Sequence, residues 1–155
     1  MIVFVHQPEF IPWLGFFDKI LRCDLFVIYD DAQFQHGGFH NRNRVRTPEG
    51  WSWVTVPINH GHPQKISDVK IAGSQWIDKH LNIIKNLYGK APFFEDYYPT
   101  LEDALNMRYQ SLSSLNLMLI KIIAKRLGAK ANITRSSDLH KRGEDKNGKL
   151  VEICK

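Results

Sequence analysis

Residues 1–29 read MIVFVHQPEFIPWLGFFDKILRCDLFVIY, and two apolar runs within them, at 1–5 and 25–29, predict buried strands. Between these runs apolar side chains recur at helical spacing, and Pro12 suits the first turn of a helix because its missing N–H costs nothing there. A strand, a helix and a second strand in so short a segment favour a parallel strand pair. We therefore expect an α/β fold with an open, largely parallel, Rossmann-like sheet, flanking helices and a helical C-terminal half.

The rest of the chain predicts helices separated by a few short strands. Residues 30–50 are polar and predict a long loop. The expected strands lie at 51–58, 69–72 and 131–134, and the expected helices run from Ser74 to Gly89, over 93–106 and over 111–127, with a last helix starting at 150. Pro99 leaves open whether 93–106 forms one helix or two. Gly128 is expected to cap the helix before it.

Composition indicates a single globular domain over residues 1–155. The chain is 43% hydrophobic and 24% charged, which suffices for a buried core. No apolar run is long enough to predict a membrane span, and the N-terminus lacks the features of a secretion signal. Two cysteines, Cys23 and Cys154, form no disulfide framework. We expect a cytoplasmic protein with free thiols.

Positive charge is concentrated in the second half of the chain. The net charge is +5, and residues 121–142 hold seven basic side chains against one acidic side chain. Such a stretch can attract phosphates or nucleic acid, but basic residues more often coat the exterior of a helix. Because no helix-turn-helix, RNA-recognition or zinc-finger pattern occurs, nucleic acid is not an expected partner.

Polar residues follow both strands of the first unit. His6-Gln7-Pro8 comes after the first strand, at the point where ligands bind in open α/β sheets, and His6 can exchange a proton near neutral pH. Asp30-Asp31 and Gln33 follow the second strand, so Asp30 could orient His6 or a substrate amine. The alternatives are that His6 and Gln7 cap a loop by hydrogen bonds, and that the aspartates end the strand and bind the N–H groups of a turn.

A third polar motif, Asn41-Arg42-Asn43-Arg44, carries alternating cations. In an extended segment Arg42, Arg44 and Arg46 point to one side, and their planar guanidinium groups suit a carboxylate or phosphate. Asn41 and Asn43 then face the other way. The alternative is an exposed strand edge that is kept polar to prevent aggregation. We favour the anion clamp.

Metal and thiol chemistry receive little support from the sequence. His60-Gly61-His62 could supply two ligands, but a catalytic zinc needs a third and no partner motif is evident. Cys23 has no activating neighbour in the sequence. No Walker loop, GxGxxG, HExxH, GxSxG or CxxC motif occurs, so no metal is predicted and the cofactor stays unknown.

Several of these motifs together resemble the WbqC-like protein family. The matching segments are His6 to Ile20 (HQPEFIPWLGFFDKI), Asp24 with Phe26-Val27 and Asp30, Gln33-Phe34, Asn41 to Arg44, Trp53 to Pro57, Trp76 with Lys79-His80, Tyr88 with Ala91-Pro92, Leu127-Gly128 and Ser136 to Leu139. The resemblance implies a transferase of bacterial O-antigen or lipopolysaccharide synthesis, which moves glycine or another amino-acyl group to a sugar amine. A weaker, fold-level analogy is to nucleotidyltransferases.

The resemblance strengthens a specific set of candidate residues. The catalytic candidates are His6 and Asp30, and the substrate-binding candidates are Gln7, Trp13, Gln33, Asn41, Arg42, Asn43 and Arg44. The expected ligand is an anionic small molecule or a sugar nucleotide, and the oligomeric state is left open.

Two departures from the family pattern leave a second interpretation open. Lys149 stands where the family usually has Arg, and lysine cannot form a bidentate fork. Family chains usually continue past Cys154 with a further segment that includes a YLSG-like turn. The alternatives are therefore a non-catalytic nucleotide- or sugar-binding protein, or a shortened, inactive family member.

Overall fold

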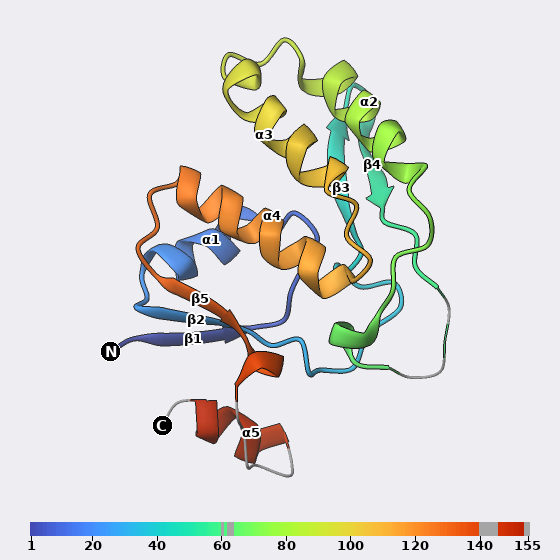
Figure 1. Cartoon of the computed structure of the whole chain (residues 1–155). Coiled ribbons are helices and arrows are strands. Elements are labelled where there is room, and N and C mark those ends of the chain that lie inside the picture. Colours follow the sequence, from blue (N-terminus) through green and yellow to red (C-terminus); the bar gives the residue numbers. More distant parts are fainter. Residues whose placement is uncertain (60, 62–63, 140–145, 154–155) are drawn as a thin grey trace.

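The computed structural model describes all residues except 60, 62–63, 140–145 and 154–155 (Figure 1). The strands are β1 (Val3–His6), β2 (Leu25–Ile28), β3 (Arg42–Thr47), β4 (Gly50–Thr55) and β5 (Asn132–Arg135). The α-helices are α1 (Leu14–Leu21), α2 (Trp76–Tyr88), α3 (Phe94–Asn106), α4 (Leu112–Arg126) and α5 (Lys146–Ile153). Two 3₁₀ turns, η1 (Ile66–Asp68) and η2 (Ser136–Asp138), precede α2 and follow β5.

Strands β1, β2 and β5 form a parallel sheet in the order β1-β2-β5. Side chains of β2 alternate between its two faces, so Phe26 and Ile28 pack against α1 and α4, whereas Val27 packs with Ile153 of α5. Figure 1 shows α1 and α4 on one side of the sheet and α5 on the other. The predicted α/β class and the parallel pair are thus confirmed.

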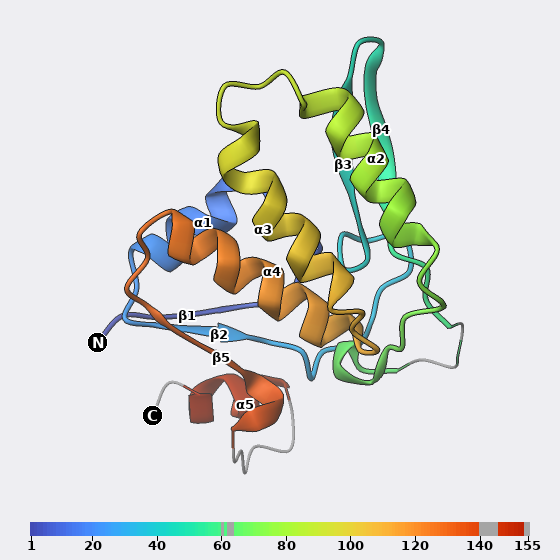
Figure 2. The same ribbon diagram turned by 45° about the horizontal axis from the view of Figure 1, so that its top comes forward.

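Strands β3 and β4 form a separate antiparallel sheet, in which Arg44 is paired with Trp53. The prediction of one long loop over residues 30–50 is therefore wrong for β3. Its sequence, RNRVRT, has no apolar face, and the segment is extended because it pairs along its whole length with the tryptophan-bearing strand β4. Figure 2 shows this hairpin standing beside α2, away from the parallel sheet.

Helix α4 joins the two parts of the molecule. Its first half, through Leu112, Leu115 and Leu119, belongs to the core between the hairpin and helices α2 and α3. Its second half, through Ile120 and Ala124, packs on the parallel sheet. Helix α4 therefore takes part in both cores and lies between the two parts of the molecule (Figure 2).

Of two predicted helix ends, Gly128 ends α4 as predicted, whereas Pro12 does not begin α1. Gly128 has φ +79° and ends α4 as predicted, with the N–H of Gly128 bonded to Lys125 and that of Ala129 to Ala124, as in a Schellman motif. Helix α1 begins only at Leu14, so Pro12 lies before the helix and not in its first turn.

Two other predictions are corrected by backbone pairing. Residues 69–72 form isolated bridges and no strand, because Lys70 pairs with Ser111 while Ile71 pairs with Ile58. Of the two alternatives for 93–106, one continuous helix forms across Pro99, which falls in the second turn and removes only one backbone bond.

Candidate functional site

The parallel sheet brings the ends of three distant segments to one edge. His6 of β1, Ile28 of β2 and Arg135 of β5 are register partners, so the residues that follow each strand start from the same edge. In open α/β sheets this carboxyl edge is where ligands bind. This carboxyl edge is therefore the candidate site for a ligand.

Asp30 lies at this edge and is fully buried, with 0% of its surface exposed. Its Oδ2 accepts hydrogen bonds from the hydroxyls of Ser113 (2.7 Å) and Ser137 (2.9 Å). Its Oδ1 accepts from the Ser136 hydroxyl (3.2 Å) and the Ser137 N–H (3.0 Å). This Asp30 network, consisting of Asp30 and these three serines, ties the end of β2 to η2 and to the start of α4.

Arg135 lies next to the Asp30 network and is held from two sides. Its guanidinium makes two 2.9 Å bonds to the carboxylate of Asp138, and its Nη1 lies 3.4 Å from the Ser114 hydroxyl. Hydrogen bonding to Asp138 raises the pKa of Arg135, with a further contribution from the charge of Asp30. The edge thus carries a fixed ion pair between Arg135 and Asp138.

His6 has a defined tautomer at the end of β1. Its Nδ1 lies 2.9 Å from the Gln7 carbonyl oxygen, and because a carbonyl only accepts, Nδ1 carries the proton. In the neutral ring Nε2 is then unprotonated and can accept a proton. The ring packs edge-on against the buried Phe16, with centroids 4.9 Å apart, and His6 itself is half-buried.

The structure brings the segment after His6 together with the segment of the third motif. The His40 Nδ1 donates to the Pro8 carbonyl at 2.9 Å, and the Phe10 N–H donates to the Phe39 carbonyl at 3.0 Å. The Asn43 amide donates to the carbonyls of Phe10 (3.2 Å) and Ile11 (2.6 Å). Two motifs some thirty residues apart in the sequence are therefore joined directly by hydrogen bonds.

Arg42 and Arg44 lie on the opposite face of β3 from Asn43, as the alternation predicts. The Arg42 guanidinium lies 4.1 Å from the centre of the Trp53 ring, and that of Arg44 lies 4.0 Å from Trp51 and 4.8 Å from Trp53. We call these four residues the Arg–Trp ladder. Arg42 also donates to the carbonyls of residues 37 and 38, which anchors that loop.

The remaining candidates occupy varied positions. The Asn41 amide donates to the Val56 carbonyl at 2.9 Å, so it fixes the start of the hairpin. Trp13 is 61% exposed and its ring lies over Gly15, where any Cβ would come within 2.0 Å of it. Gln33 is exposed and forms a bridge with Lys65, and Gln7 is half-buried beside His6.

Among the described residues, no hydrogen bond joins Asp30 to His6. The His6 Nδ1 meets the Gln7 carbonyl, and the carboxylate oxygens of Asp30 meet serines. Asp30 therefore does not orient the His6 ring by a direct hydrogen bond.

Metal and thiol chemistry gain no geometric support. Among the described residues no group of three or more His, Cys, Asp or Glu side chains could hold a metal ion, and His60 and His62 lie outside those residues. Cys23 is buried, its thiol lies 3.5 Å from the Ile20 carbonyl, and burial raises its pKa. A raised pKa makes the nucleophilic thiolate scarcer.

Sequence reasoning missed several residues that build this site. Ser113, Ser136 and Ser137 bond to Asp30, Arg135 interacts with the charge of Asp30, and His40 links the two motifs. The Asn116 amide also donates to the His40 carbonyl, at 2.8 Å, which holds that link against α4. A signal for the serines was present, because Ser136-Ser137 follows a predicted strand that would end at the same edge if it were parallel.

No helix in the described residues is long and apolar enough to cross a membrane.

No solved structure matches the chain significantly. The chain is 33% identical over 155 residues to the uncharacterized protein Rv1507c of Mycobacterium tuberculosis (strain ATCC 25618 / H37Rv), a match that covers 98% of this chain and 67% of that protein. The model of the WbqC-like protein family matches residues 7–155, nearly the whole chain. The chain therefore belongs to the WbqC-like protein family.

Proposed function

We propose that this protein is a transferase of bacterial surface-polysaccharide synthesis, which moves glycine or another amino-acyl group onto a sugar amine. The observation that carries the proposal is the tautomer of His6. Its Nδ1 donates to the Gln7 carbonyl, which leaves Nε2 as a proton acceptor at the carboxyl edge of a parallel sheet. Family membership agrees with this proposal. We also propose that the protein is cytoplasmic and that its parallel sheet is Rossmann-like.

In the proposed reaction the sugar amine attacks the acyl carbonyl of an activated donor. A C–N bond forms, the bond to the leaving group breaks with its electron pair, and His6 Nε2 takes the proton of the amine. A positioned base of this kind contributes roughly 10²–10⁴-fold in rate. Asp30 acts as a positioning residue, because its bonds to three serines fix the strand ends around His6.

We assign recognition of an anionic donor or sugar nucleotide to Arg42 and Arg44. Their guanidinium faces lie on tryptophan rings, which leaves the N–H groups at the guanidinium edges for hydrogen bonds. Arg42 uses Nε and Nη2 on the carbonyls of residues 38 and 37, so in this proposal its Nη1 and the edge of Arg44 bind the carboxylate or phosphate. The hydrogen bonds from Asn43 to the carbonyls of Phe10 and Ile11 hold β3 against the segment that follows His6. Arg42 and Arg44 lie on the opposite face of the strand, so in this proposal the donor is recognised on the outer face of the hairpin.

The test is turnover of activated glycine and nucleotide sugars, with products followed by mass spectrometry. His6→Ala should lower turnover by about 10²-fold or more while calorimetry shows unchanged donor binding. His36→Ala, at an exposed histidine, is the matched control and should keep full turnover. Arg42→Ala should instead weaken donor binding. Full activity in His6→Ala would exclude the base, and unchanged affinity in Arg42→Ala would exclude the clamp.

A non-catalytic nucleotide- or sugar-binding protein is the second candidate. One observation favours it: both carboxylate oxygens of Asp30 are occupied by serine donors in a fully buried site, so Asp30 offers no second acid or base to a substrate. For this candidate, calorimetry would show saturable binding of a nucleotide sugar while mass spectrometry shows no product with any amino-acyl donor.

A further inference from the structure

A cavity of about 430 Å³ lies among α2, α3 and α4, and its lining includes Ile11, whose carbonyl accepts a hydrogen bond from Asn43. Its walls include Ile84 of α2, Leu101 of α3, and Ile122 and Ile123 of α4. None of the nine candidate residues lines it. Figure 2 shows α3 and α4 side by side along this part of the molecule. Its volume falls within the range of small-molecule pockets.

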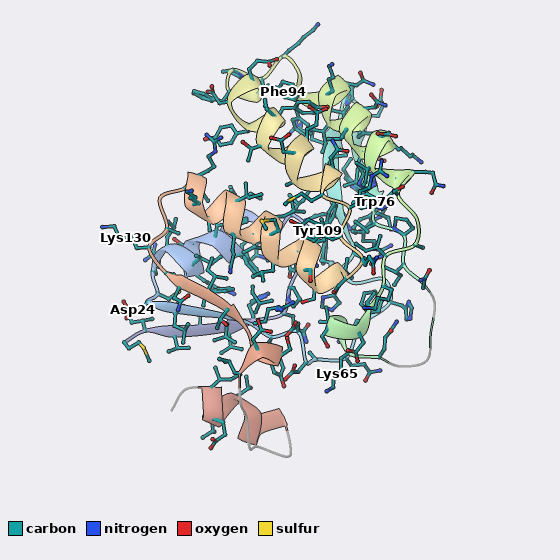
Figure 3. The ribbon with its side chains drawn as sticks, in the orientation of Figure 1. Asp24, Lys65, Trp76, Phe94, Tyr109 and Lys130 are labelled. Atoms are coloured by element: carbon teal, nitrogen blue, oxygen red, sulfur yellow. The ribbon has the colours of Figure 1, made fainter. Side chains whose placement is uncertain are left out.

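The mouth of this cavity exposes large apolar side chains. Phe93 is 66% exposed, Tyr97 is 51% exposed and Leu127 is 45% exposed, and all three line the cavity. Phe94, which also lines it, marks the start of α3 in Figure 3. Apolar side chains exposed together around a hollow are typical of a binding site. Because the walls are aliphatic and aromatic, the buried part of a ligand must lack polar groups.

One cation stands among the lining residues. Arg126, the last residue of α4, donates from Nη2 to the Thr100 hydroxyl at 2.8 Å, and its guanidinium lies 5.7 Å from the centre of the Tyr97 ring. Within the described part of the chain no carboxylate lies within ion-pair distance of it. Its charge is therefore held in place and available to an anion.

We propose that this cavity binds an amphiphile with a single hydrocarbon chain and an anionic end. The chain would lie against Leu101, Ile122 and Ile123, and the carboxylate or phosphate would meet Arg126. A hollow with one cation and apolar walls matches such a molecule in both shape and charge. Free fatty acids and lipid headgroups share this chemistry, and the test separates them.

The probe is dodecanoate, titrated calorimetrically below the concentration at which it forms micelles. Saturable binding of one molecule per chain is expected, and affinity should rise about fourfold with each added methylene until the cavity is filled. Dodecanol should bind two- to fivefold more weakly, roughly the contribution of one exposed ion pair. Absence of dodecanoate binding up to its solubility limit would overturn the proposal.

Two matched pairs of variants locate the site. Ala91→Trp places an indole in the lining at an exposed position and should weaken dodecanoate binding at least tenfold, whereas Asn86→Trp, exposed and outside the lining, should not. Arg126→Gln should weaken dodecanoate but not dodecanol, whereas Lys125→Gln, one residue away and outside the lining, should change neither. Unchanged melting temperatures show that each variant is folded.

Three outcomes would overturn the proposal. The first is equal affinity in Ala91→Trp and wild type. The second is binding to vesicles of anionic phospholipid without binding of free dodecanoate, which would indicate a membrane surface instead. The third is a concentration-dependent dimer that Ala91→Trp abolishes, which would show that a second copy covers the cavity. Since the lining excludes His6, Arg42 and Arg44, these outcomes are independent of the proposed transferase activity.

Discussion

Asp30 and Arg44 both belong to motifs that predict a binding or catalytic role, yet their surroundings differ completely. The Asp30 carboxylate is 0% exposed and accepts four hydrogen bonds, whereas the Arg44 guanidinium is exposed and lies on two tryptophan rings. The Asp30 network has its polar groups satisfied inside the fold. In the Arg–Trp ladder, Arg44 presents its charge to solvent. The first arrangement favours stability, and the second leaves charge free for a ligand.

The largest effect should come from the Asp30 network. Asp30→Ala removes the acceptor of three serine hydroxyls and one backbone N–H, two of which belong to the buried residues Ser113 and Ser136. Buried donors without acceptors are costly, so the free energy of unfolding should fall by about 4 kcal/mol in urea titrations.

Asp103→Ala is the matched control for this change. Asp103 is an exposed carboxylate on α3, and its replacement should change the free energy of unfolding by no more than about 0.5 kcal/mol. If Asp30→Ala were as stable as Asp103→Ala, the Asp30 network would contribute nothing to the fold, and the contrast with the ladder would disappear.

The two regions also differ in how much of their structure could be predicted from the sequence. The parallel pair β1 and β2 was predicted because apolar runs report burial locally. Whether the carboxylate at the end of β2 meets a ligand or the protein depends on Ser113 and Ser136, which lie 83 and 106 residues further along the chain. No local pattern encodes such a partner.

The hairpin shows the opposite difficulty. Strand β3 was missed because RNRVRT carries no apolar face, although the prediction that Arg42 and Arg44 share one side needed only an extended backbone. The face of β3 that packs on the rest of the protein is the one that carries Asn43, because the Asn43 amide bonds to the carbonyls of Phe10 and Ile11. These partners are also distant in the sequence. Alternation along a strand was predictable, but its pairing was not.

His80 differs from Asp30 because it is a buried polar side chain with one ring nitrogen that lacks a hydrogen-bond partner. It is 4% exposed, packs against Trp76, and its Nδ1 has no hydrogen-bond partner. Figure 3 labels Trp76 at the start of α2. Burial lowers the pKa of His80 to about 4, below the usual value of 6.5. The folded state therefore disfavours the protonated imidazole.

Since the pKa of His80 is lower in the folded state, its stabilising contribution is complete above pH 6.5 and is lost as the pH falls towards 4. This loss should reach about 3 kcal/mol of unfolding free energy at pH 4. The difference in unfolding free energy between wild type and His80→Gln, measured from pH 7 to pH 4, isolates the effect from that of the carboxylates. An NMR titration that gives His80 a pKa near 6.5 would contradict the prediction.

Asn43 tests the side of the hairpin that faces the protein. Asn43→Ala removes the two bonds to the carbonyls of Phe10 and Ile11 and should lower the free energy of unfolding by about 2 kcal/mol in urea titrations. Asn82→Ala, at an exposed asparagine on α2, is the control and should be neutral. An equally small effect for both would mean that these bonds do not hold the hairpin against the segment after His6.

The smallest effect on stability should come from the exposed side of the same strand. Arg44→Ala removes the contacts with Trp51 and Trp53 and should cost only about 0.5–1 kcal/mol in urea titrations, because cation–π contacts at exposed sites are weak. The same variant should lose affinity for an anionic donor.

A double-mutant cycle of Arg44→Ala with Trp51→Ala separates these two roles of Arg44. A coupling in unfolding free energy of about 0.5–1 kcal/mol is expected from the direct contact between the two side chains. A coupling of several kcal/mol would mean that the ladder is built for stability, like the Asp30 network, and the argument that its charge serves a ligand would lose its basis. A small coupling together with lost anion binding would instead establish that β3 presents opposite properties on its two faces, with Asn43 binding the protein and Arg44 binding the ligand.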